Sequence, residues 1–447
     1  MKKGIARAIC MAFFCGVFLY LIAHITYVLR TNTEEKRNLM GFYYEKNNSL
    51  DAVFIGSSSL WRSINPLLIY EDYGIASYII ATSAQRPSSL YYLLKEAQKT
   101  QPDAVYFIDV STAKYDNEVW EKQNEGSIRR VTDGLKYSFN RIACNYEQTR
   151  GRDNQLAYYF DIIKYHSEWR NFKENISHWN FELEHKGKGF NIATSVTPLN
   201  TFVWEKEDEI PLCEEAEKTL QKLLSYCKDN NIKAEFTLAV STSMTYGKAE
   251  YIRKLIERYG YELYVFNEHL EDMKIDYTSD FVDAGHLNLM GSQKVSSYFG
   301  EYISNKYSFS DKRTDKDYAS WNVNLNQMKE EMAKAIAHAE IMKPLEALMT
   351  DYEIKDNNEI VIFAKKNEEI NVEYAWYVYE RDNEKDEWER TDTQWYTTSG
   401  EFAYVYNPDK YYHILRFARL VENTDVANQK YVAALHFDGK EWIIESD

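Results

Sequence analysis

The sequence predicts a mixed α/β domain that is followed by a smaller all-β domain and preceded by one membrane-spanning helix. Three observations support this order. Residues 8–29 are almost unbroken apolar, strand-like and helical runs alternate from residue 51 to residue 306, and apolar residues recur at every second position after residue 350. The 447 residues have room for two or three domains that each bury a core.

The apolar run Ala8–Leu29 is long enough to cross a bilayer as a helix, which takes ~20 residues. A cleaved signal peptide has a shorter apolar region and a small-residue cleavage site, so we expect a retained signal-anchor over residues 1–30. Basic residues before the run favour a cytoplasmic amino terminus, and basic residues after it weaken that preference (Lys2, Lys3 and Arg7; Arg30, Lys36 and Arg37). We expect a single-pass protein of the cell membrane whose bulk is extracytoplasmic.

Composition excludes some classes of function. A formal net charge of −16 argues against a nucleic-acid partner, because no basic surface would dominate that field. The local excess of basic residues between residues 129 and 152 is expected to be a solvated face, or else a patch that meets an anionic polymer or headgroup (Arg129, Arg130, Lys136, Arg141, Arg150 and Arg152). The sequence has no Cys-x-x-Cys or His-x-x-x-His spacing, so we expect neither a metal nor a cofactor.

After the span, residues 31–50 are polar and mixed, and we expect a stalk. The next domain, residues 51–322, alternates strands with helices. The predicted strands are Ala52–Ile55, Ile75–Ala81, Ala104–Val110, Ala234–Val240 and Tyr261–Phe266. The predicted helices are Pro66–Tyr73, Ser88–Lys99, Pro211–Asp229, Ala249–Tyr259 and Met290–Lys306. This alternation predicts a mostly parallel five-stranded sheet in a three-layer α/β/α, flavodoxin-like arrangement, with ligands bound beyond the carboxyl ends of the strands.

Three further segments complete the predicted organisation. Residues 111–210 interrupt the alternation as an insertion that is a candidate substrate wall. Residues 323–350 form a charged helical connector. Residues 351–447 contain seven short strand-like runs separated by turn signals, which predicts a β-sandwich accessory domain that binds polymer or orients the preceding domain.

Two short motifs carry the predicted chemistry. The strand Val53–Ile55 runs into Gly56 and a cluster of serines, and the segment Asp283–Asn288 places a carboxylate three residues before an imidazole. Each motif is weak alone, because strands often end in small polar residues and Asp-x-x-His is common. Their order places a serine at the first strand and the imidazole just before the last helix of one parallel sheet. Together they supply the nucleophile, base and orienting acid of a serine hydrolase or acyltransferase.

The chain resembles the SGNH/GDSL hydrolase superfamily over roughly residues 51–321, and in particular its membrane-anchored members in Gram-positive bacteria. The matching segments are FIGSSSLWRSINPLLIYEDYGIASYIIATSAQRPSSLYYLLKEA, YHSEWRNF, DFVDAGHLNLMGSQKVSSYFGEYI and DKRTDKDYASW. These proteins are similar in type to the exported partners of cell-envelope polymer acylation, such as the alginate acetylation and teichoic-acid D-alanylation proteins.

The resemblance implies roles for individual residues. Ser58 matches the nucleophile, with Ser57 and Ser59 as neighbours that the pattern does not exclude. His286 matches the general base and Asp283 the group that orients it. The backbone N–H of Ser58 would contribute to the oxyanion hole.

The chain departs from the family pattern at three places. The second block reads Ala81-Thr82-Ser83-Ala84-Gln85, so alanines replace both glycines, and Ala84 would supply an oxyanion N–H from a residue that disfavours positive φ. Asp109 stands at the end of the third strand, where the third block has asparagine. Ser59 replaces a histidine or glutamate found in many relatives. These changes keep a pseudoenzyme open as an alternative.

Other candidates for substrate contact lie beside the nucleophile or in the insertion. They are Trp61 and Arg62 in the first block, and Trp169 or Trp179 as sugar-stacking residues. The resemblance thus implies an O-acyltransferase or esterase that acts on a cell-surface polysaccharide, with a multispanning membrane acyltransferase as acyl supplier. The alternative is an inactive SGNH-fold protein that binds glycan or serves as an assembly scaffold.

Overall fold

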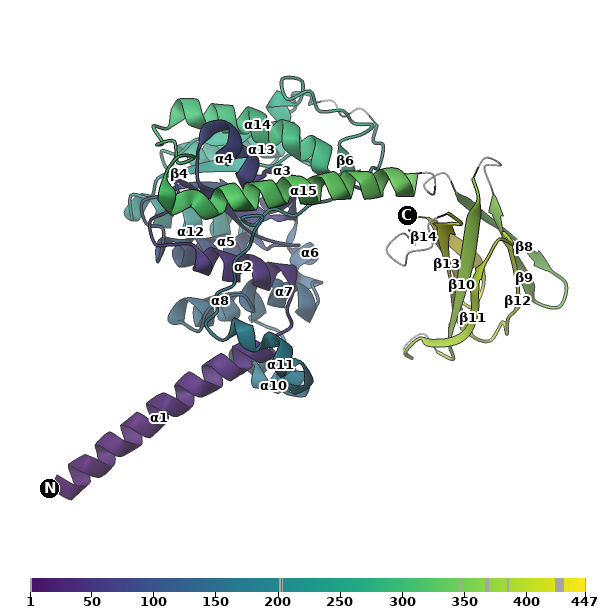
Figure 1. The fold of residues 1–447 in the computed structure, drawn as a ribbon, viewed down its shortest axis with the longest axis horizontal. Coiled ribbons are helices and arrows are strands. Elements are labelled where there is room, and N and C mark those ends of the chain that lie inside the picture. The colour runs from purple at the N-terminus through teal and green to yellow at the C-terminus, as the bar shows by residue number, and fades with distance from the viewer. Residues whose placement is uncertain are drawn as a thin grey trace. The chain divides into compact units, whose positions relative to one another are not determined.

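The computed structural model describes residues 2–446 except 201, 203, 344, 346–347, 366–369, 384–385 and 423–429. The chain divides into two compact units, Met1–Met332 and Ala333–Asp447 (Figure 1). Parts of the predicted connector and of the predicted β-sandwich fall on positions outside the described residues.

The first unit is built on a five-stranded parallel sheet, as the alternating pattern predicts. The strands are β1 Ala52–Ser57, β2 Ser77–Thr82, β3 Val105–Asp109, β4 Ala234–Leu238 and β5 Leu263–Val265. Their order is β2-β1-β3-β4-β5, and all neighbours pair in parallel. The order reverses at β1, so the carboxyl end of β1 lies at the switch point where such sheets bind ligands.

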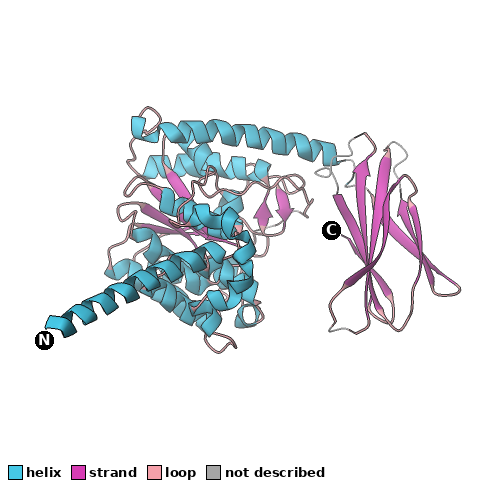
Figure 2. Cartoon of the chain, turned by 60° about the horizontal axis from the view of Figure 1, so that its bottom comes forward, coloured by secondary structure: helices cyan, strands magenta, loops and turns pink. Residues whose placement is uncertain are grey.

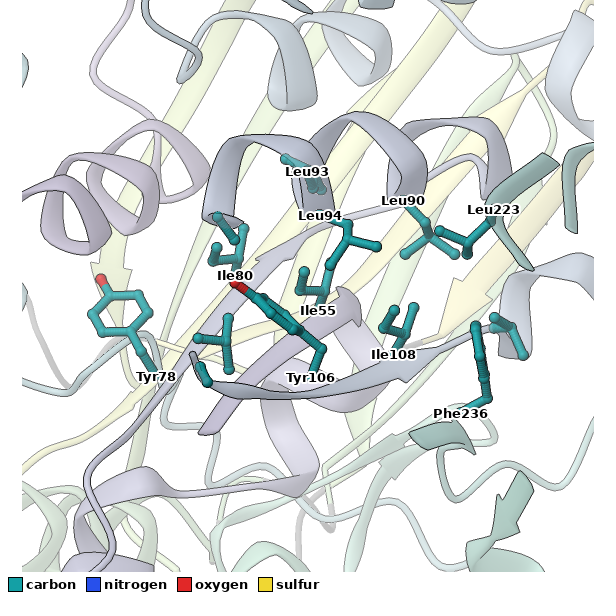
Figure 3. Close-up of a cluster of buried hydrophobic side chains, with 14 of the residues drawn as sticks. Ile55, Tyr78, Ile80, Leu90, Leu93, Leu94, Tyr106, Ile108, Leu223 and Phe236 are labelled. Carbon is teal, nitrogen blue, oxygen red and sulfur yellow. The ribbon is translucent and has the colours of Figure 1, made fainter. Parts of the chain in front are cut away.

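Helices cover both faces of the sheet (Figure 2). One face packs mainly against α2 Glu34–Tyr44, α5 Pro87–Gln98, α12 Glu214–Asp229 and α13 Tyr246–Glu257, and the other mainly against α3 Ser58–Ser63 and α14 Leu289–Lys306, with α4 Pro66–Tyr73 contributing to both. Figure 3 shows the first core, in which Ile55, Ile80 and Ile108 of the strands meet Leu94 of α5 and Leu223 of α12. The strands read as continuous apolar runs because both of their faces are buried.

Residues 31–50 do not form the expected stalk. They contain α2, whose first turn is capped by Thr33, and whose Leu39 and Phe42 are buried in the core. The Asn38 side chain donates to the carbonyl of Ile79 in β2 over 2.9 Å. Several of the polar residues that indicated a stalk are themselves buried, since Glu35, Lys36 and Asn38 are at most 6% exposed, so the helix belongs to the first unit.

The N-terminal helix α1 spans Lys2–Leu29, and its stretch Gly4–Leu29 is long and apolar enough to cross a membrane. The insertion after β3 folds into a series of short helices, several of which lie beside the C-terminal end of α1 (Figure 1). Their bounds are η1 Ser111–Lys114, α6 Asn117–Glu121, α7 Glu125–Thr132, α8 Phe139–Thr149, α9 Leu156–Tyr159, α10 Ile162–Tyr165, η2 His166–Asn171, α11 Phe172–Asn175 and η3 Ile176–His178.

The predicted helical connector is α15, Ala319–Met342, which begins four residues earlier than expected. Trp321 and Leu325 at its start are buried in the first core, so this half of the helix belongs to the first unit. The connector does not extend to residue 350, because a strand already begins at Met349.

The second unit is an antiparallel, sandwich-like β domain. One sheet has the order β11-β10-β13-β14-β15 and the other β12-β9-β8. The strands are β8 Met349–Lys355, β9 Glu359–Lys365, β10 Val372–Arg381, β11 Glu389–Thr397, β12 Glu401–Val405, β13 Tyr411–Leu420, β14 Lys430–Phe437 and β15 Trp442–Ser446. Seven of them match the prediction. The eighth, β8, was missed because it is an edge strand whose side chains are mostly exposed.

Candidate active site

Three side chains from distant parts of the sequence of the first unit are joined by hydrogen bonds. Ser58 Oγ lies 2.7 Å from His286 Nε2. His286 Nδ1 lies 2.8 Å from both carboxylate oxygens of Asp283. This is the geometry in which an imidazole accepts a serine proton through one nitrogen while a carboxylate fixes its other nitrogen as the donor.

Ser58 is held at the carboxyl end of β1, where the strand turns directly into α3. Ser57 is buried, 4% exposed, and it gives the helix no side-chain cap. Of the three adjacent serines, Ser58 is the one whose hydroxyl meets the imidazole. The N–H groups of the first turn of α3 lack helical partners, which leaves that of Ser58 available to an oxyanion.

Gly56 is required here by space rather than by backbone conformation. A Cβ built on Gly56 would lie 2.7 Å from the Cβ of Asp109 in β3 and 2.8 Å from a methyl carbon of Leu60 in α3. Gly56 lies inside β1 rather than in a turn after it. Its missing side chain lets α3 approach the sheet and so sets the position of Ser58.

The imidazole and carboxylate come from a small hairpin of β6 Phe281–Asp283 and β7 His286–Leu287. The Gly285 N–H donates to Asp283 Oδ1 over 2.8 Å, and the Thr242 N–H and hydroxyl both donate to the carbonyl of Ala284. Asn288 then caps α14 by accepting from the N–H groups of the first turn. His286 is therefore fixed on both sides, by the loop after β4 and by the start of a helix.

A pocket of about 410 Å³ opens beside Ser58 and His286. Its wall includes Ala84 and several side chains from the start of the insertion, which the sequence analysis did not single out: Ser111, Thr112, Lys114, Tyr115, Val119, Trp120 and Gln123. The first part of the insertion thus forms one wall of the pocket. Ser111 and Thr112 could have been predicted from their position, as Ser58 was. They are hydroxyl residues that come just after β3, at the carboxyl edge of the sheet where ligands bind.

Ala84 adopts the left-handed conformation, with φ of 50°, in the loop after β2. Its carbonyl accepts a hydrogen bond from the Gln123 side chain over 2.7 Å. The conformation that a glycine would allow is therefore kept with an alanine in its place, at the cost of backbone strain.

Replacing Ala84 by glycine is expected to raise the free energy of unfolding by about 0.5–1 kcal/mol, because relief of the left-handed strain exceeds the added chain entropy. Ala81→Gly, in β2 just before this loop, is the matched control and should lower it by about 1 kcal/mol. Denaturant unfolding of the two variants would check this. A loss of stability in Ala84→Gly would show that the loop is not strained.

Asp109 does not line the pocket. It is 1% exposed and accepts hydrogen bonds from the Ala239 N–H at 2.9 Å and the Ser111 hydroxyl at 2.7 Å. Burial raises the pKa of this carboxyl, and the two donors oppose the rise. Asp109 joins the ends of β3 and β4 and supports the loop that forms the wall, and its carboxyl does not reach the pocket as the expected oxyanion or substrate group would.

The expected aromatic and arginine contacts also lie away from the pocket. Trp61 is 4% exposed and packs in the core behind α3, so it does not face a sugar ring at this pocket. Arg62, next to it in α3, is not among the lining residues. Trp179 packs against His24 of α1 with ring centroids 5.1 Å apart, and Trp169 is exposed beside Arg170.

Lys114 is the cation of the pocket wall. Its Nζ donates to the hydroxyls of Ser241 and Ser243 over 2.9 and 2.8 Å. Burial lowers the pKa of this ammonium to about 8. The group should therefore lose its charge as pH rises through about 8, and Lys114 is the candidate in this wall for contact with an anionic part of a substrate.

We expect the KM for an ester substrate that carries a carboxylate to rise several-fold as pH increases through about 8, because Lys114 then loses its charge. In Lys114→Met the KM should be high at every pH and this rise should be absent. An uncharged ester of the same size is the control. A KM that follows pH identically in both proteins would remove Lys114 from substrate binding.

Within the described part of the chain, no group of three or more His, Cys, Asp or Glu side chains is placed to hold a metal ion. No protein-family model, curated protein or solved structure matches this chain.

Proposed function

We propose that the chain is a membrane-anchored SGNH-type serine esterase or O-acyltransferase that acts on a cell-surface polysaccharide. The observation that carries the proposal is the unbroken contact from Ser58 Oγ through His286 to Asp283 beside an open pocket. The Ser58–His286 and His286–Asp283 contacts lie at hydrogen-bond distance without a bound substrate, as activation of the serine requires.

The proposed reaction has two transfers at Ser58. His286 Nε2 takes the hydroxyl proton while Ser58 Oγ attacks the acyl carbonyl, and the tetrahedral oxyanion is held by backbone N–H groups such as those of Ser58 and Ala84. The leaving group departs with the proton from His286, which leaves an ester on Ser58. A polymer hydroxyl or water then gives its proton to His286 and attacks this ester. The acyl group passes to that oxygen and Ser58 regains its proton.

Anchoring and partners follow from α1 and from the resemblance. We propose that α1 spans the cell membrane once and that the bulk of the chain is extracytoplasmic, because three basic residues precede the apolar stretch (Lys2, Lys3, Arg7). Acyl transfer at a surface needs an acyl supply. A multispanning membrane acyltransferase is the partner that the resemblance implies.

The experiment supplies the purified full chain with an acetyl ester donor and a cell-wall polysaccharide, and follows both free acetate and polymer-bound acetate. Acetate on the polymer that depends on Ser58 identifies a transferase. Free acetate alone identifies an esterase, since the balance between them depends on how well water is excluded.

The second candidate is an inactive SGNH-fold protein that binds glycan or an assembly partner. The observations that favour it are the strained alanine in the second block and the burial of Asp109, which leaves no side chain in the pocket at the position of the family's asparagine. A folded protein that binds polysaccharide with the same affinity before and after Ser58→Ala, and shows no turnover, would establish this function instead.

A further inference from the structure

The last turns of α1 are packed against the second half of the insertion. The His24 ring lies 5.1 Å from the ring of Trp179 and 4.7 Å from that of Phe181. At the helix end, Arg30 is fully buried and its guanidinium donates to Asp161 over 2.9 Å. The helix thus enters the first unit without a free linker, and the elements around residues 160–181 lie alongside its final turns (Figure 1).

The exposed part of α1 sets the depth at which these elements would lie. Every residue from Gly4 to Ile22 is exposed, whereas the side chains from Thr26 to Arg30 are buried against the unit. At 1.5 Å per residue the exposed part is roughly 28 Å long, close to the ~30 Å hydrocarbon core of a bilayer. The helix segment between His24 and Arg30 then falls at the level of the lipid headgroups.

The surface around this segment carries large apolar side chains that point to solvent. Phe160, Ile163, Trp169 and Ile176 are 61%, 52%, 65% and 42% exposed. Arg170 and Lys173 are exposed among them. We call these six residues the collar, and all of them lie on, or next to, elements that contact α1: α10, η2, α11 and η3.

We propose that the collar lies in the interfacial region of the bilayer and binds lipid, so that the first unit is fixed to the membrane surface by α1 and the collar together. Tryptophan beside aliphatic and basic side chains is the composition that favours the membrane interface, where the apolar groups are buried and the cations reach the headgroups. The proposal rests on the proposed insertion of α1, because that insertion sets the depth of the collar.

Apolar burial, rather than charge, would dominate this contact. Glu168 and Glu174 lie on the same short helices as Arg170 and Lys173, so the local charge is nearly balanced. Lipid is favoured over a protein as the partner of the collar, because the collar continues the exposed apolar surface of α1 at the depth where the hydrocarbon core ends. Binding should therefore be similar in zwitterionic and anionic vesicles.

The test uses the full chain reconstituted into phosphatidylcholine vesicles whose lipids are brominated near the headgroup end of the acyl chains. Bromine quenches only tryptophans in contact with it. The fluorescence of wild type minus that of Trp169→Phe is the emission of Trp169. This difference is measured in brominated and in ordinary vesicles, and its decrease in the brominated vesicles is the quenching of Trp169. Trp61→Phe is the matched control, because Trp61 is buried in the core behind α3.

We expect at least half of the Trp169 signal, and little of the Trp61 signal, to be quenched. Flotation of the vesicles in alkaline carbonate tests separately whether α1 is inserted. An unquenched Trp169 in protein that floats with the vesicles would overturn the collar and leave this surface to a protein partner. Protein that does not float would overturn the membrane anchoring and the collar together.

Discussion

Replacing Ser58 by alanine is expected to lower kcat/KM for acetyl esters by at least about 10³-fold, because it removes the atom that forms the covalent intermediate. The alanine keeps the size of the side chain at the turn from β1 to α3, so folding should be unaffected. Steady-state hydrolysis of a chromogenic acetyl ester by the full chain in detergent would measure the loss.

His286→Ala should reduce the rate by a similar factor, and the double variant should be no worse than either single one, because the two residues act as a unit. Ser304→Ala is the control. This serine lies on the exposed side of α14 and its hydroxyl donates only to the carbonyl of Glu301. Additive losses from Ser58→Ala and His286→Ala would contradict a shared mechanism.

Replacing Asp161 by asparagine is expected to lower the free energy of unfolding by about 3–5 kcal/mol, because it leaves buried guanidinium groups without their counter-charge. Asp161 is fully buried and accepts hydrogen bonds from Arg30 and Arg141 at 2.9 Å and from the Tyr137 hydroxyl. It joins the end of α1 to the insertion. Urea unfolding followed by tryptophan fluorescence would measure the loss.

The effect of Asp161 should depend on pH. Burial raises the pKa of this carboxyl, but the charges of Arg30 and Arg141 lower it more, so that its pKa lies below the usual range. A lowered folded pKa gives stability that is present above the unfolded pKa, about 3.9, and is lost as pH falls through the folded value. The difference between wild type and Asp161→Asn should therefore be largest above about pH 4 and shrink in stronger acid.

Glu125→Gln is the matched control, since Glu125 also pairs with a buried arginine of this region, Arg129, but is itself 41% exposed. The free energy of unfolding of Glu125→Gln should fall by less than about 1 kcal/mol, as it does when other exposed ion pairs are removed. Equal losses in Glu125→Gln and Asp161→Asn would mean that the buried charges do not hold α1 to the unit.

The sheet could be predicted from sequence because its strands are continuous apolar runs of the right length, with helical periodicity between them. Burial of β1 on both faces follows directly from Ala52–Ile55, and the order of the two motifs along one parallel sheet brought Ser58 and His286 to the same edge. The contact between these two residues, which are far apart in the chain, therefore follows from topology rather than from local pattern.

Other features could not be predicted because they depend on packing between distant segments. The polar residues of 31–50 concealed an α2 that packs on β2, and the exposure pattern of β8 concealed an edge strand. Trp61 and Asp109 stand in the first and third blocks of the family pattern, which implied site residues, yet Trp61 packs in the core and Asp109 joins two strands. Lys114 was missed because the insertion shows no periodicity that would place it at the pocket.

Covalent labelling of the full chain with a fluorophosphonate, followed by mass spectrometry of its peptides, would show directly whether Ser58 is an activated nucleophile. Such probes react with a serine only when a base activates it, so an adduct reports activation without knowledge of the natural substrate. We expect one adduct, on Ser58, that is lost in His286→Ala. A folded protein with no adduct on Ser58, or with an adduct that survives His286→Ala, would contradict this expectation.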